Sequence, residues 1–310
     1  MTDDCKPKPL RISWTQLLRF EDCARSAQLM REGNREKGIV DQRNFLGGNC
    51  TDNAMRRWLE SDNPEKTSPV PLGKTLLAEY IEKQGDQIRW KGSKAQDVKK
   101  VLVDIEEALT TLEPWLRENV LPYPYEPEAR GTARMLVADV DGTLRCVDLF
   151  YAVDIAVKRP EGFKLYDLKT TRNDKYVEGK TLGQLTYYKL AWMVKFRLEP
   201  DDFAGLAFIT PLTKNFLTEV YPENREIQVI ANRIMRYAQA AWNGIAPTKT
   251  QVDSSCQYRC EVRNSCPLYK LPEVMNSGRI DFTKLIEAQK LLSDTTELDK
   301  LGMVNLEHDK

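Results

Sequence analysis

Histidine is nearly absent from this sequence of 310 residues, since the one histidine is His308 near the C-terminal end. This scarcity excludes a catalytic triad built on histidine and a zinc site rich in histidine. An excess of positive charge is also missing, because 46 basic side chains are matched by 46 acidic ones. A surface that binds nucleic acid would therefore have to arise from local clustering of basic residues.

Long apolar runs are missing as well, and no stretch reaches the ~20 apolar residues that a membrane-spanning helix needs. The first ten residues, Met1 to Leu10, are polar and charged and do not resemble a secretory signal. We therefore expect a cytoplasmic protein without a membrane partner. The composition, 41% apolar and 30% charged, is typical of a soluble globular chain with a substantial core.

Cysteine is distributed unevenly along the chain. The seven cysteines are Cys5, Cys23, Cys50, Cys146, Cys256, Cys260 and Cys266. An odd number of cysteines in a cytosolic chain argues against a framework of disulfides. The last three fall within eleven residues, and such clustering indicates metal ligation. Iron–sulfur clusters and structural zinc both take four cysteine ligands, so a fourth must come from elsewhere.

The pattern of apolar and polar residues predicts an α/β protein in which helices cover a mixed β-sheet. Four helices are expected first, at Ser13–Arg31, Cys50–Glu60, Lys74–Lys83 and Lys94–Glu118. Five strands are expected at Arg134–Ala138, Leu144–Val157, Phe163–Thr170, Phe203–Ile209 and Phe216–Val220. Two further helices are expected at Leu182–Phe196 and Arg225–Trp242.

A pair of acidic residues lies on two consecutive predicted strands. Alternate side chains of a strand share a face, so Asp167 and Lys169 point the same way. Asp154 lies thirteen residues earlier, and a tight turn at Pro160 to Gly162 makes the two strands antiparallel neighbours. Asp154 and Asp167 then converge and suit a hard ion such as Mg²⁺, which would hold a water for attack on phosphorus. The alternative is a structural ion pair between Asp167 and Lys169.

Asp154 followed by Asp167-Leu168-Lys169-Thr170 resembles the catalytic core of the PD-(D/E)XK nucleases, and the Asp-x-Lys-Thr form resembles their RecB-like members. The resemblance implies a restriction-endonuclease-like fold, in which a mixed sheet is flanked by helices. It also implies that DNA phosphodiester bonds are hydrolysed with Mg²⁺ or Mn²⁺. Asp154, Asp167 and the backbone carbonyl of Leu168 would bind the ion, and Lys169 would act in catalysis.

The family motif continues with a glutamine and a tyrosine on the next helix. This sequence has Gln184 and Tyr188 there, four residues apart and therefore on one helical face. The resemblance implies that both line the active site. RecB-like nucleases usually add a histidine ligand from an early helix, after a glycine. In Gly48-Asn-Cys-Thr-Asp52, Asp52 occupies that position as a candidate ligand for Mg²⁺ or Mn²⁺. The alternative is a surface residue near a helix start.

The order of the cysteines resembles that of RecB-like nucleases with an iron–sulfur cluster, among them the Cas-four family, the AddB nuclease domain and phage exonucleases. Their pattern is one early cysteine, the nuclease core and three late cysteines. The resemblance implies a structural 4Fe-4S cluster held by Cys23, Cys256, Cys260 and Cys266. Zinc stays an alternative, because Ala24 stands where proline is frequent and because three residues separate Cys256 from Cys260.

The resemblance also divides the chain. The expected parts are a flexible N-terminus at 1–12, a nuclease domain at 13–270, and a tail at 271–310 with one probable helix. Within the domain we expect a helical part at 13–120, a catalytic core at 126–243 and the cysteine cluster segment at 250–270. The implied substrate is single-stranded DNA or a DNA end, with exonuclease action favoured. A homo-oligomer, or partner proteins of recombination or CRISPR adaptation, are the other partners considered.

Two rival interpretations remain. Leu136 to Leu144 matches the signature of haloacid-dehalogenase phosphatases, with Asp139 as nucleophile and Asp141 as acid. A hairpin turn at Asp141-Gly142 is the favoured reading of the same residues. The second rival is a DNA-binding module with a cluster or zinc and a degenerate catalytic site, which the presence of Asp52 favours.

Overall fold

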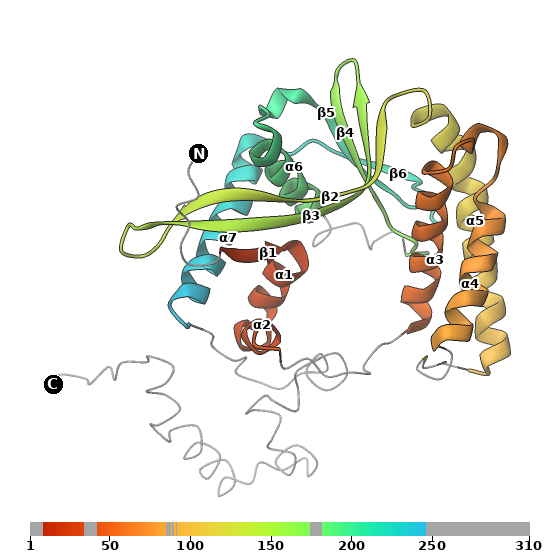
Figure 1. Ribbon diagram of the computed structural model, residues 1–310, viewed down its shortest axis with the longest axis horizontal. Helices are drawn as coiled ribbons and strands as arrows, with labels where there is room; N and C mark the ends of the chain where they lie inside the picture. The colour runs from red at the N-terminus through yellow and green to blue at the C-terminus, as the bar shows by residue number, and fades with distance from the viewer. Residues whose placement is uncertain are drawn as a thin grey trace, which may run out of the picture. The chain divides into compact units, whose positions relative to one another are not determined.

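A computed structural model describes residues 9–33, 42–84, 88, 90, 92–173 and 182–245. Over these residues the chain is a mixed α/β protein, as expected (Figure 1). It divides into two compact units, the first made of 1–14, 40–136 and 146–232, and the second of 15–39, 137–145 and 233–310. Within the described residues, no helix is both long enough and apolar enough to cross a membrane.

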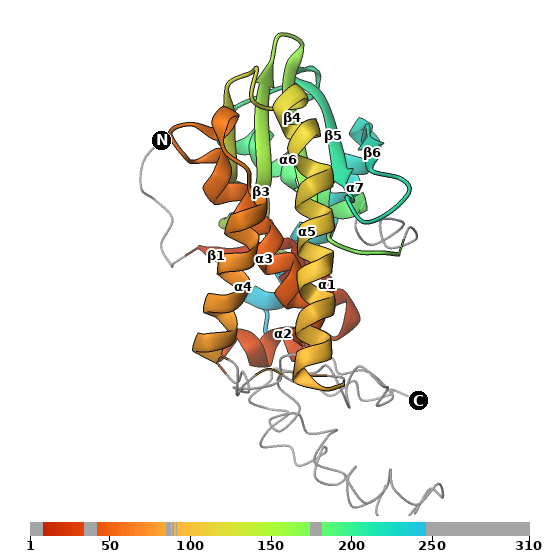
Figure 2. The same cartoon turned by 90° about the vertical axis from the view of Figure 1, so that its right-hand side faces the viewer.

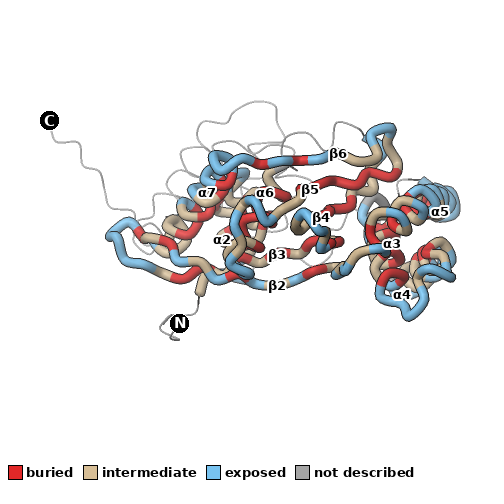
Figure 3. The backbone as a smooth tube through the Cα atoms, turned by 90° about the horizontal axis from the view of Figure 1, so that it is seen from above, coloured by how far each residue is buried: buried red, intermediate tan, exposed pale blue. Residues whose placement is uncertain are grey.

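The described strands form one six-stranded mixed sheet in the order β1-β3-β4-β5-β6, with β2 paired to β3. Their bounds are β1 Leu10–Ser13, β2 Tyr125–Ala138, β3 Leu144–Arg159, β4 Gly162–Leu168, β5 Phe203–Ile209 and β6 Leu217–Val220. β3 is antiparallel to β4, while β1 is parallel to β3 and β4 is parallel to β5. The restriction-endonuclease-like architecture of a mixed sheet flanked by helices is confirmed. Figure 3 shows that many residues of β3, β4 and β5 are buried.

Alternation along the central strands assigns their side chains to two faces. Tyr166 and Leu168 of β4 belong to the hydrophobic core beneath the helices of the 42–119 region, together with Ile155 of β3. Phe163, two residues before Leu165, instead contacts Trp192 with ring centroids 5.4 Å apart. Because the period of a strand is two, Asp167 lies on the same face as Phe163, away from the aliphatic core.

Three helices pack together and cover the aliphatic face of the sheet in the first unit. They are α3 (Gln42–Leu59), α4 (Val70–Gln84) and α5 (Lys94–Asn119), and Figures 1 and 2 show them side by side. The Ser93 side chain caps α5 by accepting from Gln96 N at 3.4 Å. Gly73 lets α4 approach α5, since a Cβ there would lie 2.6 Å from side-chain atoms of Ile105 and Leu109.

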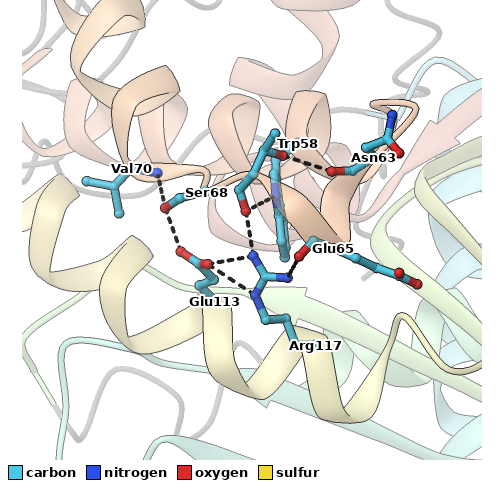
Figure 4. Close-up of polar contacts among 8 residues, drawn as sticks. Trp58, Asn63, Glu65, Ser68, Val70, Glu113 and Arg117 are labelled. Atoms are coloured by element: carbon cyan, nitrogen blue, oxygen red, sulfur yellow. Dashed lines mark hydrogen bonds and ion pairs between the residues drawn. The ribbon is translucent and has the colours of Figure 1, made fainter.

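A network of polar contacts fastens the segment between α3 and α4 to α5 (Figure 4). The Arg117 guanidinium donates to the carbonyl of Glu65 at 2.6 Å and pairs with Glu113 at 2.8 Å. Glu113 also accepts from Ser68 Oγ at 2.6 Å, and the Trp58 indole donates to the carbonyl of Thr67 at 3.2 Å. Backbone carbonyls that no helix satisfies are thus paired, and the C-terminal end of α3 is held in place.

The opposite face of the sheet packs against α6 (Leu182–Phe196) in the first unit. Tyr187 is fully buried, and its hydroxyl donates to the carbonyls of Ile12 at 2.7 Å and Phe150 at 3.2 Å. Trp192 lies against Tyr151, with ring centroids 6.1 Å apart. These contacts fix the rotation of α6 about its axis, and with it the positions of the residues one turn earlier.

In the second unit, α1 and α7 are joined by side-chain contacts. The bounds of its helices are α1 Trp14–Asp22, α2 Ala24–Arg31 and α7 Asn224–Trp242, with the first residue of α1 and the first half of α7 belonging to the first unit. Arg233 forms an ion pair with Glu21. Phe20 and Tyr237 meet edge to face, with ring centroids 4.9 Å apart.

The structure differs from the sequence-based expectation at several places, among them the start of α3, which is Gln42 and not Cys50. Leu10–Ser13 is a strand instead of flexible chain, because Ile12 is fully buried and the segment pairs with β3. The helix expected over Ser13–Arg31 breaks at Cys23, which has the extended angles φ −158° and ψ 103°. β2 begins at Tyr125 and includes Pro127, which an edge strand tolerates. The helix expected in the tail lies outside the described residues.

Candidate active site

The two acidic residues of the predicted motif lie side by side, Asp154 within β3 and Asp167 near the end of β4. Leu168 N donates a hydrogen bond of 2.6 Å to Asp154 Oδ2, so the two strands have the antiparallel register that the sequence predicts. Asp167 is only 2% exposed, and its Oδ2 forms an ion pair with Lys169 Nζ. Asp154, Asp167, Lys169 and the peptide of Leu168 therefore form one cluster.

Gln184 joins this cluster from α6. Its Nε2 donates to Asp167 Oδ1 at 3.0 Å and to the hydroxyl oxygen of Tyr188 at 2.8 Å. A glutamine amide carries two N–H donors, so both bonds can exist together. Tyr188 is 8% exposed, and burial, followed by the charge of Asp167, raises the pKa of its phenol. The structure thus brings the glutamine and tyrosine of the sequence motif to the acidic pair.

Asp52 reaches the same region from α3. A Cβ placed on Gly48 would lie 2.8 Å from Thr170 Oγ1, so the absence of a side chain lets α3 approach the end of β4. Asp52 follows Gly48 by four residues and is therefore on the same side of the helix. The charge of Asp52 raises the pKa of Asp154, and the charge of Asp167 raises the pKa of Asp52.

Burial raises the pKa of all three carboxyl groups, and repulsion by a neighbouring carboxylate adds to the rise for Asp154 and Asp52. For Asp154 the pKa is raised well above its ordinary value, first by burial and then by the charges of Asp167 and Asp52. For Asp52 burial and the charge of Asp167 raise the pKa, and Arg56, Arg130 and Lys169 oppose the rise. Burial also raises the pKa of Asp167, against the lowering effect of Lys169. Burial is the largest cause for all three groups, so their ionised forms are unfavourable without a further positive charge.

Three neighbouring carboxyl groups whose ionised forms are unfavourable fit a divalent cation. Among the described residues, no group of three Asp, Glu, Cys or His side chains is arranged as a closed metal site. Mg²⁺ does not require one, because it binds through one or two carboxylates and keeps several waters. Asp167 Oδ2 is buried and accepts no hydrogen bond of good geometry beyond its ion pair with Lys169. The donors are hard oxygens, as Mg²⁺ and Mn²⁺ prefer.

Two arginines near Asp52 were not among the site residues predicted from the sequence. Arg56 follows Asp52 by one helical turn, and Arg130 comes from β2. Both lower the pKa of Asp52, and both form ion pairs with Glu128, Arg56 at 3.1 Å. Arg56 could have been predicted from the sequence, because residues four apart in a helix lie on one face. The position of Arg130 could not be predicted from the sequence, because it depends on the path of β2 relative to α3.

The cysteines proposed as cluster ligands are described only in part. Cys23 is a free, partly exposed thiol between α1 and α2, while Cys256, Cys260 and Cys266 lie outside the described residues. Cys50 and Cys146 are buried, as expected of core residues, and burial raises the pKa of the Cys50 thiol to about 11. Cys146 is disulfide-bonded.

Asp139 of the phosphatase-like signature is a structural residue of the β2–β3 hairpin. Its side chain pairs with Arg145 at 3.0 Å and accepts from Asn243 Nδ2 at 2.9 Å. Its backbone N–H donates across the turn to the carbonyl of Thr143 at 2.8 Å. A nucleophile needs an oxygen free to reach phosphorus, and both oxygens of Asp139 are engaged. The hairpin interpretation is therefore the better one.

Residues 11–267 match the sequence profile of the PD-(D/E)XK nuclease superfamily. The chain therefore belongs to this superfamily. Its members are nucleases, generally with Mg²⁺ or Mn²⁺, so a metal-dependent nuclease acting on DNA is the activity that membership indicates. The coarse resemblance read from the sequence is confirmed.

A search among curated proteins gave no match. Eight chains of solved structures match. One of them, titled "Crystal structure of SSO0001", has 18% sequence identity and a TM-score of 0.31, covering 62% of this chain and 80% of that chain. At that TM-score the likeness supports no conclusion about this chain.

Replacing Asp154 by asparagine is expected to stabilise the metal-free protein at about pH 8, by on the order of 1 kcal/mol or more. A raised pKa means that the folded state favours the neutral acid. The contribution of Asp154 to stability is therefore fully present below its pKa in the unfolded chain, and it is lost as the pH rises through its pKa in the folded protein. The gain should therefore vanish at about pH 4, near the ordinary pKa of Asp. Denaturant unfolding at both pH values measures it.

Asp148→Asn is the matched control for this prediction. Asp148 lies on the same strand and pairs with Arg134 at 2.9 Å, so its substitution should not stabilise the protein at either pH. An equal destabilisation by Asp154→Asn at both pH values would show that repulsion at the cluster is absent. Addition of Mg²⁺ should stabilise the wild type more than Asp154→Asn, because ion binding favours the folded state.

Proposed function

We propose that this protein is a metal-dependent exonuclease of the RecB-like type, acting on single-stranded DNA or DNA ends. One observation carries the proposal: Asp154, Asp167, Lys169 and Gln184 are linked by contacts into a single cluster. A merely structural ion pair would explain Asp167 and Lys169 but not the convergence of Asp154 and Gln184 on them. Membership of the nuclease superfamily supports the same activity.

The residues of the cluster have separate roles in the proposed hydrolysis. Asp154 and Asp167 would hold the divalent ion, with Asp52 and the Leu168 carbonyl as further oxygen donors. The bound ion would supply positive charge near the scissile phosphate and favour an ionised water. Water oxygen bonds to phosphorus while the bond from phosphorus to the leaving oxygen breaks, and that oxygen takes up a proton. Lys169 stabilises the charge that develops on the phosphate oxygens.

Gln184 and Tyr188 position the acidic pair. The amide of Gln184 donates to Asp167 Oδ1 at 3.0 Å, which leaves Oδ2 directed at Lys169. Tyr188 accepts from the same amide and thereby restrains its rotation. Both residues belong to α6, whose rotation is fixed by the buried Tyr187.

Lys169→Ala is expected to lower DNA degradation by about 10²-fold to 10³-fold, the loss typical when one electrostatic contact to the transition state is removed. End-labelled single-stranded and blunt duplex DNA, each with Mg²⁺ or Mn²⁺, measure the rate, and the product ladder reports polarity. Lys158→Ala, an exposed lysine of β3 stacked on Phe163, is the matched control. If the wild type binds DNA but degrades neither substrate with either ion, the catalytically degenerate DNA-binding module takes precedence.

Asp52→His is expected to raise the ratio of the Mn²⁺-supported rate to the Mg²⁺-supported rate by roughly 10-fold, because imidazole suits softer ions better than Mg²⁺. The change restores the histidine that RecB-like nucleases usually carry. Asp52→Asn, which removes the charge at constant size, should instead lower the rate with both ions. An unchanged ion preference in Asp52→His would remove Asp52 from the set of ligands.

We also propose a structural 4Fe-4S cluster bound by Cys23, Cys256, Cys260 and Cys266, within a nuclease domain of residues 13–270. Support comes from Cys23, whose extended backbone separates two helices and leaves a free thiol that is partly exposed. Such a cluster would close a loop of over two hundred residues. Its contribution to stability would come from constraining the unfolded chain, on the order of 5 kcal/mol.

Cys23→Ala is expected to abolish the iron and sulfide content of anaerobically purified protein and to lower its thermal stability. Cys50→Ala is the matched control, because Cys50 is a free thiol in the core of α3, and it should keep full iron content. Zinc without iron in the wild type would replace the cluster by the zinc alternative. Full iron content in Cys23→Ala would contradict the ligand assignment.

A further inference from the structure

Helix α3 turns one polar face away from the hydrophobic core, and this face carries Asp52. A helix advances by 100° per residue, which places Phe45, Gly48, Asp52 and Arg56 within one narrow stripe. The residues on the other side of α3 are buried in the core, among them Leu46, Cys50, Ala54 and Trp58. The stripe therefore passes over the end of β4, where Gly48 approaches Thr170.

Phe45 is an unusual member of this polar stripe. Its side chain is 62% exposed, although phenylalanine is ordinarily buried. It lies seven residues before Asp52, which corresponds to ~10 Å along the helix axis. An exposed aromatic ring at this distance from a site for phosphodiester chemistry is suited to stack on a nucleobase.

Two arginines lie at the other end of the stripe. Arg56 and Arg130 form ion pairs with the same carboxylate, that of Glu128. Glu128 has φ +50°, a left-handed conformation that non-glycine residues seldom adopt. Arg130 is 59% exposed in its side chain, so its guanidinium is held beside the acidic cluster and still faces solvent. Such a guanidinium is suited to bind a phosphate oxygen.

We propose that this face of α3 binds a single DNA strand across the acidic cluster. A base stacks on Phe45, the scissile phosphate lies near Asp52, and phosphates beyond it pair with Arg130 and Arg56. The inference rests on the proposed function and names the residues that bind its substrate. Phe45 and Arg56 are ~16 Å apart along the helix, which at 3.4 Å or more per nucleotide is at most about five nucleotides.

The arrangement selects single strands over duplexes. A base can stack on Phe45 only when its face is free of its neighbour, and a paired duplex offers free faces at its ends alone. The arginines compensate the repulsion that the carboxylates exert on the sugar–phosphate backbone. A strand bound in this way also contacts both α3 and β2, so each contact can be removed without touching the acidic cluster.

Binding of fluorescently labelled oligothymidylate, followed by anisotropy, tests the role of Phe45. Ca²⁺ replaces Mg²⁺, because it supplies the same charge with a looser geometry, and a gel checks that the oligonucleotide stays intact. Phe45→Ala should weaken binding by roughly 5-fold to 150-fold, the effect of losing one stacked base. Phe196→Ala is the matched control, since Phe196 is 48% exposed at the end of α6. Binding to a long duplex should change little in either variant.

The salt dependence of binding tests the role of the arginines. Arg130→Gln should reduce the slope of log Kd against log salt by about 0.7, the value for one phosphate contact to a single strand. Arg134→Gln is the matched control, because Arg134 lies on the same strand and pairs with Asp148. A role of Arg130 in folding alone would weaken binding without changing this slope.

The outcomes separate the inference from the proposed function. If the wild type degrades DNA, Lys169→Ala does not, and Phe45→Ala binds oligothymidylate as tightly as the wild type, the strand path along α3 is wrong while the nuclease stands. If the wild type neither binds nor degrades DNA, both are wrong. Thermal unfolding of each variant checks that the fold is intact. Phe45 and Arg130 are both exposed, so we expect their substitutions to leave the unfolding temperature nearly unchanged.

Discussion

The hydrogen bond from Leu168 N to Asp154 is the interaction on which the site depends. It joins the end of β4 to the interior of β3, and the register it reflects places Asp154 beside Asp167. A shift of one residue would turn every side chain of β4 to the other face, which would bury Tyr166 among the polar groups and expel Asp167 from the cluster. The aliphatic core beneath α3, α4 and α5 prevents that shift, so hydrophobic packing on one face maintains the chemistry on the other.

The cost of this arrangement is electrostatic. Burial raises the pKa of three neighbouring carboxyl groups, and the charge of Asp167 raises it further for Asp154 and Asp52, while one lysine and two arginines act in the opposite direction. A chain selected for stability alone would not assemble such a group, because like charges in a buried site oppose folding. A bound cation would favour the ionised carboxylates, and a phosphate backbone could then approach a site that would otherwise repel it.

Much of this could be predicted from the sequence, because strands and helices impose regular spacing on their side chains. The antiparallel pairing of β3 with β4 followed from period and turn chemistry, and the placement of Gln184 followed from the family resemblance. Other features depend on contacts between distant segments. Three features have no local signal in the sequence: the pairing of Leu10–Ser13 with β3, the helix break at Cys23 and the approach of Arg130 to Asp52. At the helix break, for example, the sequence has neither glycine nor proline beside Cys23.

Gln184 has a property that its neighbours lack: its side chain is a donor at one end and an acceptor at the other. With Asp167 ionised, the NH₂ group must face the carboxylate, as it does here. A proton on Oδ1 of Asp167 would offer a hydrogen in the same place and would require the amide to rotate by half a turn. That rotation would withdraw the donor from Tyr188 as well. The orientation of a single amide on α6 thus depends on whether one oxygen of the acidic cluster carries a proton.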